Sequence, residues 1–250
     1  MCKAEQSLRN GFAVKLKRRG PRFLRKIDLW IDQWWQAVPL EHKLPRSPKL
    51  WRLDSDKLKR WAVKPNPKFK GPGCRLLGGF SANGPRPAKM IFATPYTRLN
   101  QHTALTMWKK IIMPALKKHY PGRATFLVQQ DGDRSLNANA VVNALSEMGV
   151  TIAFRGGASG PQAPARMCEF WPVETVWANR STAVRKMVQK SKKWSKGFAG
   201  TVKKRTLKSW EAAVLGVVRR VGSSFLQALH DGMPKRLKRL LDAKGGPIGK

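Results

Sequence analysis

Apolar residues recur with two different periods along the chain, and these periods separate predicted strands from predicted helices. Short apolar runs between turn residues are typical of strands, whereas spacings of three and four residues are typical of helices. The first two strand-like runs, 27–32 and 34–40, predict two strands joined by a tight turn at Asp32 and Gln33. Further strand-like runs lie at 74–84, 88–93, 124–131 and 150–154.

Helical spacing dominates the second half of the chain. Thr103 is a suitable cap for the first predicted helix, and Pro114 should bend or split that helix because proline lacks an amide proton. Pro172 suits the first turn of a later helix. The predicted helices cover 103–120, 136–149, 172–191, 206–221 and 223–243. Strands followed by alternating helices and strands predict an α/β fold, in which helices cover a mixed sheet.

The charge of the chain adds to the predicted α/β fold a preference for a polyanionic partner. The chain has 50 Lys and Arg against 14 Asp and Glu, a formal net charge of +36. Such an imbalance repels itself in a compact fold unless a polyanion neutralises it, so nucleic acid is the expected partner. An anionic membrane surface is the weaker alternative, and no apolar run is long enough to predict a transmembrane helix.

Two segments concentrate the positive charge. Residues 1–26 predict a basic N-terminal arm, which is either solvated or serves in phosphate gripping or nuclear import. Residues 190–205 predict a basic linker, which is either solvated or contacts the DNA backbone without reading its sequence. The linker residues expected to bind nucleic acid are Lys192, Lys193, Lys203, Lys204 and Arg205.

Because acidic residues are scarce, the position of each one is informative. Asp32 ends a predicted strand, Asp131 ends the strand-like run ATFLVQQ, and Glu174 lies in the first turn of a predicted helix. Carboxylates at buried strand ends are costly unless a cation lies beside them. Hard cations such as Mg²⁺ prefer oxygen ligands, and paired ions can promote phosphodiester cleavage. Ordinary caps or surface ion pairs are the alternative for each acid taken alone.

Three segments in the second half carry a resemblance to a known family. They read ALTMWKKIIMPALKKHYPGRATFLVQQDGDR (104–134), FWPVETVWANRSTAVRK (170–186) and LHDGMPKRLKRLLDAKGG (229–246). In this order they resemble the QQD motif, the motif around the third catalytic acid and the C-terminal signature of the mariner superfamily of cut-and-paste DNA transposases. LWIDQWWQAV (29–38) resembles the family's first catalytic strand. The resemblance runs from about residue 27 to residue 246.

The resemblance implies an RNase H-like mixed sheet flanked by helices over residues 27–189. Residues 206–250 would form a helical C-terminal extension of this DDE catalytic domain, after the basic linker at 190–205. The implied activity is metal-dependent DNA cleavage and strand transfer in the nucleus, with a homodimer left open. The residues that would be catalytic and would hold two Mg²⁺ or Mn²⁺ ions are Asp32, Asp131 and Glu174.

Several departures from the family pattern keep alternatives open. Asp54 and Asp56 are rivals of Asp32 for the first acid, while Glu169 and Asp133 are expected to be a bystander and a surface residue. The paired helix-turn-helix region of the family is missing, so we expect a truncated or domesticated copy or an incomplete gene model. The alternative function is an inactive relic that only binds nucleic acid, and a ribosome-associated protein is a third reading.

Overall fold

The computed structural model describes residues 3–20, 22–39, 72–155, 162–164, 167, 169–194 and 203–248. Within these ranges five strands form one mixed sheet in the order β3-β2-β1-β4-β5. β1, β2 and β3 pair antiparallel, whereas β4 pairs parallel to β1 and β5 parallel to β4. The expected mixed sheet is therefore confirmed. The strands are β1 Leu29–Ala37, β2 Gly73–Ser81, β3 Lys89–Tyr96, β4 Phe126–Gln129 and β5 Val150–Ile152.

β1 is a single strand, so the predicted turn at Asp32 and Gln33 is wrong. Its pairing with β2 is continuous, and Asp32 lies opposite Gly78 in the middle of the ladder. Gln33 is not the glycine that a tight hairpin turn after an aspartate demands, and β2 offers an uninterrupted row of hydrogen-bonding partners. The first acid therefore lies in the interior of a central strand.

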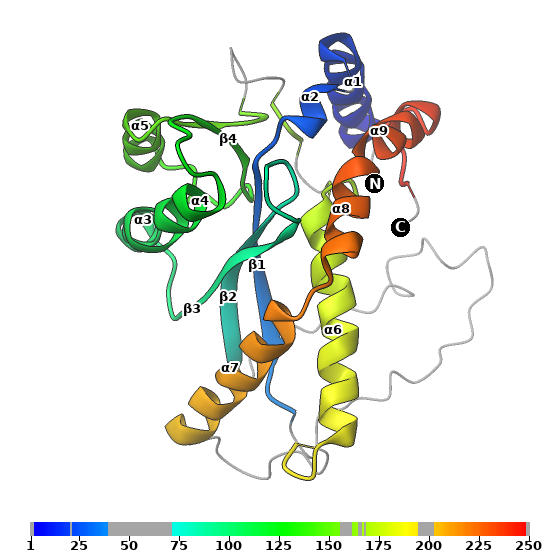
Figure 1. The fold of residues 1–250 in the computed structure, drawn as a ribbon. Helices are drawn as coiled ribbons and strands as arrows, with labels where there is room; N and C mark the ends of the chain where they lie inside the picture. The colour runs from blue at the N-terminus through cyan, green and yellow to red at the C-terminus, as the bar shows by residue number, and fades with distance from the viewer. Residues whose placement is uncertain are drawn as a thin grey trace, which may run out of the picture.

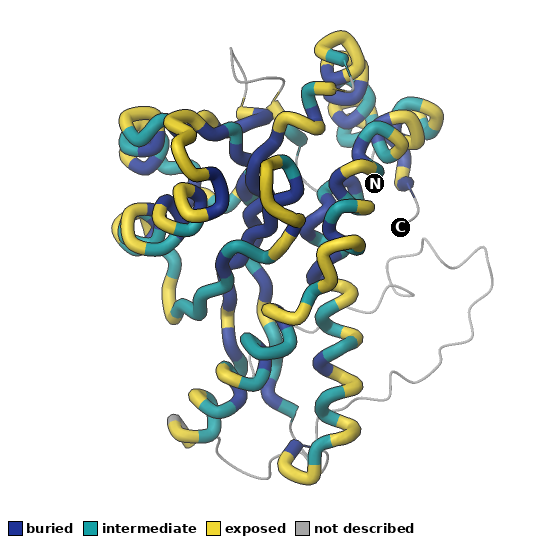
Figure 2. The backbone as a smooth tube through the Cα atoms, in the orientation of Figure 1, coloured by how far each residue is buried: buried dark blue, intermediate teal, exposed yellow. Residues whose placement is uncertain are grey.

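Helices cover both faces of the sheet (Figure 1). α3, α4 and α5 lie on one face and bury Trp108, Leu116 and Leu145, while α6 and the C-terminal helices cover the other face. Buried backbone follows the sheet between these two layers (Figure 2). The helices are α1 Lys3–Arg19, α2 Arg22–Arg25, α3 Gln101–Met107, the π-helix η2 Trp108–Ile112, α4 Met113–His119, α5 Asn139–Glu147, α6 Pro172–Lys190, α7 Lys204–Arg219, α8 Ser223–Asp231 and α9 Met233–Asp242.

Pro114 interrupts the regular α-helical pattern, although the backbone stays helical from Gln101 to His119 and does not split. The turn before it widens into a π-helix, in which the N–H of Met113 donates to the carbonyl of Trp108, because proline cannot supply the next donor of a regular helix. The cap differs from the expectation. Asn100 caps α3, and Thr103 lies at the third helical position and completes a reciprocal capping box.

The two ends of the described chain belong to the same core as the sheet. In α1, Phe12 and Leu16 are buried against the cluster that also contains Trp210 of α7 and Leu237 of α9. The basic N-terminal segment is thus a helix with one apolar face and one solvated basic face, where the sequence suggested an arm. None of the helices in the described ranges is long and apolar enough to cross a membrane.

Candidate active site

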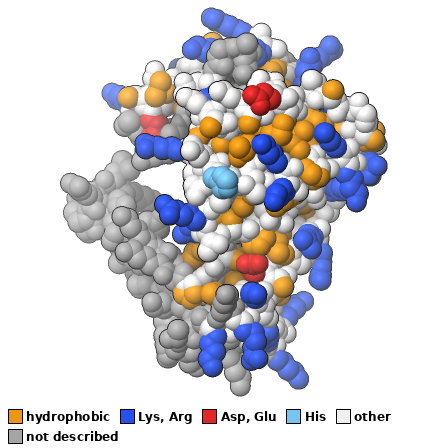
Figure 3. All heavy atoms as spheres, turned by 90° about the vertical axis from the view of Figure 1, so that its left-hand side faces the viewer, with side chains coloured by type: hydrophobic (Ala, Val, Ile, Leu, Met, Phe, Trp, Pro, Cys, Tyr) orange, Lys and Arg blue, Asp and Glu red, His pale blue; other side chains and the backbone are white. Residues whose placement is uncertain are grey.

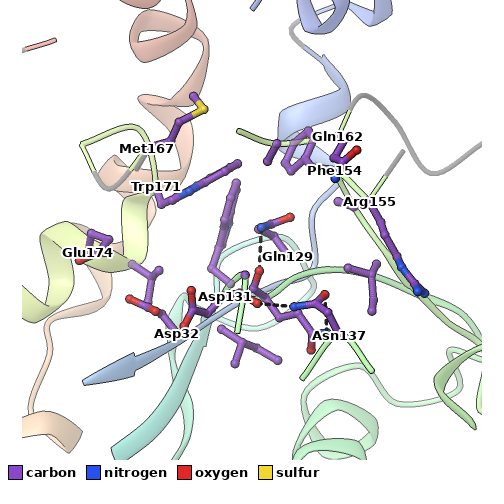
Figure 4. A pocket seen from close by; sticks show the side chains of 18 of the residues that line it. Asp32, Gln129, Asp131, Asn137, Phe154, Arg155, Gln162, Met167, Trp171 and Glu174 are labelled. Carbon is purple, nitrogen blue, oxygen red and sulfur yellow. Dashed lines mark hydrogen bonds between the residues drawn. The ribbon is translucent and has the colours of Figure 1, made fainter. Parts of the chain in front are cut away.

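Asp32, Asp131 and Glu174 line one cavity of about 670 Å³, although they are far apart in the sequence. Asp32 comes from β1, Asp131 follows the end of β4, and Glu174 lies in the first turn of α6. Because β1 and β4 are parallel neighbours with Trp30 level with Gln129, the segment that follows β4 brings Asp131 beside Asp32. Figure 4 shows the three acids gathered on one side of the cavity, across from Arg155 and Gln162.

Asp32 is a buried carboxylate in an unfavourable environment. Its side chain is 7% exposed, its Oδ1 accepts the N–H of Gln33 at 2.7 Å, and its buried Oδ2 has no hydrogen-bond partner among the described residues. Burial, and to a smaller extent the negative charges of Glu174 and Asp131, raise the pKa of Asp32 to about 8. Such an acid is held ready for a positive charge, since a cation would offset both causes.

Asp131 is fixed by side-chain amides. Gln33 of β1 donates from Nε2 to Asp131 Oδ2 at 2.8 Å, and Asn137 donates to the Asp131 carbonyl at 2.8 Å. Tyr96 donates from its hydroxyl to Gln33 Oε1 at 2.5 Å, so a chain of hydrogen bonds runs from β3 to the acid. Burial is the largest cause that raises the pKa of Asp131, and the bond from Gln33 lowers it. Sequence reasoning missed Gln33 and Tyr96, because this contact exists only across the sheet.

Glu174 is positioned by the docking of α6 on β1. The helix begins at Pro172, a residue suited to the first turn, and Glu174 is half-buried beside the cavity. Trp177, less than one turn further on, is buried and stacks on a tryptophan of β1. The indole N–H of Trp177 lowers the pKa of Asp32. The two side chains are nevertheless not joined by a hydrogen bond of normal geometry.

The chemistry of these three side chains fits a hard divalent cation. All are carboxylates, and Asp32 presents a buried oxygen with no hydrogen bond within the described part of the chain. The described residues nevertheless contain no group of three or more Asp, Glu, His or Cys arranged tightly enough to hold an ion. The structure thus brings the predicted acids to one cavity, and their convergence on a metal ion stays a prediction.

The rival acids have other settings. Asp54 and Asp56 lie outside the described residues. Glu169 pairs with Arg9 of α1, and Asp133 accepts the N–H of Ser135 at 2.7 Å. Neither Glu169 nor Asp133 lines the cavity. The expectation that these two acids are bystanders agrees with this arrangement.

The basic linker residues lie at the far end of α6 from Glu174. Lys190, the last residue of α6, is about 24 Å along the helix from Glu174 at 1.5 Å per residue. Lys192, Lys193, Lys203 and Arg205 are exposed there, and Lys204 begins α7. The structure therefore does not bring these cations to the acids. Lys and Arg side chains also spread over the opposite layer, where α3 to α5 face the solvent (Figure 3).

Comparison with known proteins gives relatives by structure and not by sequence. No protein-family model matches the chain, and no curated protein is similar to it in sequence. The solved catalytic domain of the Mos1 mariner transposase matches at a TM-score of 0.64 and 13% identity, over 100% of this chain and 98% of that domain. The same domain solved with raltegravir and Mn matches at 0.63 and 13%, over 100% and 98%.

A longer Mos1 chain shows how much of that transposase the present chain covers. In the pre-cleavage Mos1 transpososome the TM-score is 0.65 at 14% identity, with 100% of this chain covered. The present chain spans 65% of that transposase chain. At such low identity the likeness concerns the fold, and it confirms the expected RNase H-like mixed sheet flanked by helices.

Proposed function

We propose that this chain is the catalytic domain of a mariner-type DDE transposase, and that it cleaves DNA and transfers the cut strand. One observation carries the proposal. On a fold like that of the Mos1 catalytic domain, Asp32, Asp131 and Glu174 line one cavity from the central strand, the neighbouring strand end and the covering helix. The sequence motifs around Asp131 and Glu174 point to the same acids independently.

The proposed partner is DNA, and the proposed cofactor is a divalent metal ion. Structural neighbours include the Mos1 paired-end complex with the left transposon end and the Mos1 strand transfer complex. Others are Mos1 paired-end complexes with Mn and with Mg. The net charge of +36 supports a polyanionic partner for this chain as well.

The residues have separate tasks in the proposed reaction. Two Mg²⁺ or Mn²⁺ ions held by the three carboxylates would activate the attacking oxygen and stabilise the leaving oxygen of a phosphodiester. Asp32 must lose its proton to act as a ligand. Gln33 fixes the carboxylate of Asp131 from β1. The walls of the cavity position the DNA strand, so that water attacks first and the freed 3′-hydroxyl attacks target DNA later.

Mn²⁺ binding and nicking of supercoiled plasmid test the proposal together. Asp131→Ala should abolish nicking and weaken the binding of Mn²⁺ in calorimetry, while circular dichroism stays unchanged. Asp133→Ala is the matched control, because it removes a neighbouring acid that does not line the cavity. Equal nicking by wild type and Asp131→Ala would remove this acid from the proposed site and the proposal with it.

A non-enzymatic DNA-binding role is the second candidate, and the net charge of +36 favours it. In that case the protein binds DNA through its cations alone. Binding would then be equal in Mn²⁺ and in a chelator, would fall steeply with salt, and would be unchanged in a variant that lacks all three acids. Metal-dependent nicking that disappears in that variant excludes this alternative.

A further inference from the structure

Arg236, in the C-terminal helix α9, donates hydrogen bonds to the turn that leads into the helix of Glu174. Its Nη1 donates to three successive backbone carbonyls, those of Glu169, Phe170 and Trp171, at 3.2, 3.3 and 3.4 Å. Its Nη2 donates to the hydroxyl of Thr175 at 2.9 Å. One guanidinium therefore spans the junction between the turn and the first turn of α6.

This grip fixes the direction in which Glu174 points. Glu174 immediately precedes Thr175, so the same helical turn carries the acid and the hydroxyl that Arg236 binds. Trp171 is the N-cap of α6 and provides no side-chain cap. A helix that starts without a cap frays more readily at its first turn. Arg236 does not satisfy the free N–H groups there, but its bonds to the preceding carbonyls and to Thr175 hold the turn and the first helical turn together. Rotation of the first turn would swing the Glu174 carboxylate away from Asp32.

The partly buried position of Arg236 is unfavourable for its positive charge, which a purely structural role would not require. Burial, together with the charge of Arg239, lowers the pKa of the Arg236 guanidinium. In the described part of the chain no carboxylate forms an ion pair with it, and its partners are neutral oxygens. A half-buried cation without an anion gains little stability from such a position. Its planar fork of donors is, however, suited to joining several oxygens at fixed angles.

Arg9 supports the same turn from the other end of the chain. It pairs with the Glu169 carboxylate and donates to the carbonyl of Gly246 at 3.3 Å, just beyond α9. α1 and α9 lie side by side in Figure 1, close to the start of α6. The turn before the third acid is thus held between the first and the last helix.

We infer that Arg236 is a positioning residue for Glu174, and that the C-terminal helix is in this way part of the machinery that assembles the acids. The inference rests on the proposed function, since it gives Glu174 a metal ion to bind. It also gives a task to the basic motif MPKR, whose arginine contacts backbone carbonyls and a hydroxyl of the chain itself.

The test compares Arg236→Gln with Arg239→Gln. Arg239 lies three residues further along α9, is exposed, and loses the same charge on substitution. Arg236→Gln should weaken Mn²⁺ binding and plasmid nicking by roughly 10- to 100-fold, as is typical when the residue that orients a metal ligand is removed. Arg239→Gln should leave Mn²⁺ affinity unchanged. Arg236→Lys should recover only part of the loss, because an ammonium group cannot join three carbonyls and a hydroxyl.

Hydrogen exchange of the metal-free protein gives a second readout. The amides of Thr175, Val176 and Trp177, the first in α6 that have an acceptor within the helix, should exchange faster in Arg236→Gln than in Arg239→Gln, while those of α5 stay equally protected. If Arg236→Gln does not fold, Thr175→Val carries the test, because it removes the acceptor of one bond and leaves the arginine in place. Unchanged exchange at 175–177 together with unchanged Mn²⁺ affinity overturns the inference.

A double-mutant cycle separates this inference from the proposed function. If Arg236 acts through Glu174, Arg236→Gln should add no further loss of Mn²⁺ affinity to Glu174→Gln. Independent, multiplying losses overturn the positioning role. If Glu174→Gln alone leaves Mn²⁺ binding and nicking at wild-type levels, the proposed function itself fails. If Glu174→Gln is inactive while Arg236→Gln equals wild type, only the positioning role fails.

Discussion

Trp34 and Trp177 lie face to face, with ring planes 4° apart and centroids 5.3 Å apart. Trp34 follows Asp32 by two residues, so both point to the same face of β1, and Trp177 follows Glu174 by less than a helical turn. The stack therefore joins the element of the first acid to the element of the third. Gly78 leaves room for it, because a Cβ there would lie 2.7 Å from Cη2 of Trp177.

Gly78→Ala should disturb this stack. The added methyl group would push Trp177 away from the sheet, and overpacking of this kind costs about 1–3 kcal/mol of unfolding free energy. Because α6 would shift with Trp177, Mn²⁺ affinity should fall as well. Urea denaturation and calorimetry measure the two effects.

Gly216→Ala is the control for that substitution. A Cβ at Gly216 meets nothing within 4 Å, and alanine within a helix is favoured over glycine by up to about 1 kcal/mol. The control should be neutral or stabilising and should bind Mn²⁺ normally. A Gly78→Ala protein with the stability and Mn²⁺ affinity of wild type would show that the stack does not hold α6 in place.

Asp32→Asn should stabilise the metal-free protein at alkaline pH. Burial and the nearby acids raise the pKa of Asp32 to about 8, whereas the unfolded value is about 3.9. The stability that the protonated carboxyl contributes is complete below about pH 4 and is lost as pH rises through about 8. Asparagine does not ionise, so the variant avoids this loss.

Urea unfolding in a chelator at pH 5 and pH 8.5 measures the difference. The advantage of Asp32→Asn over wild type should grow between these two pH values. Saturating Mn²⁺ at pH 8.5 should restore the wild type and leave the variant unchanged. An Asp32→Asn protein that is less stable than wild type at pH 8.5 would mean that the ionised carboxylate is better satisfied than its orphaned Oδ2 indicates.

His230 is expected to have the opposite effect on stability, which should fall at acid pH. Its Nδ1 accepts the indole N–H of Trp30 at 3.2 Å, and its Nε2 faces the carbonyl of Arg25 at 3.2 Å, an arrangement that suits the neutral ring. Burial lowers the pKa of His230. Stability from the neutral ring is therefore present above the unfolded pKa of about 6.5 and is lost as pH falls through the folded value. Unfolding free energy should drop more steeply between pH 7 and pH 5 in wild type than in His230→Gln, and parallel curves would contradict the assignment.

The sequence predicted most elements of the fold, because their signals are local. The apolar runs, Pro114 and Pro172 each act within one turn or strand, and the structure bears them out. The continuity of β1 through Asp32 was missed, since only the partner strand β2 imposes it. The three acids were found through motifs. Gln33 was missed because the acid that it binds is 98 residues away in sequence. Arg236 was missed because the groups that it binds are 61 to 67 residues away.

Glutamine substitutions in the basic linker test whether it binds the DNA backbone. Replacing Lys192, Lys193 and Lys203 should reduce the slope of log affinity against log salt by about 0.9 for each phosphate that these lysines neutralise. Because these residues lie far from the acids, the nicking rate at saturating DNA should stay the same. Replacing Lys110, Lys117 and Lys118, which are exposed on the layer of α3 to α5, with glutamine is the control. Equal slopes in both variants would make the linker an ordinary solvated segment.

The pairing of β1 with β4 has a consequence for how the protein reaches its folded state. The amide of Leu127 donates to Asp28, a partner 99 residues earlier in the chain, at 2.8 Å. Closing so long a loop is slow, because its entropy is lost before the contacts that stabilise it form. Arg236 lies still later in the chain. During synthesis on the ribosome, Asp32 and Asp131 would therefore stay apart until β4 has emerged, and Glu174 would join them only once α6 has followed.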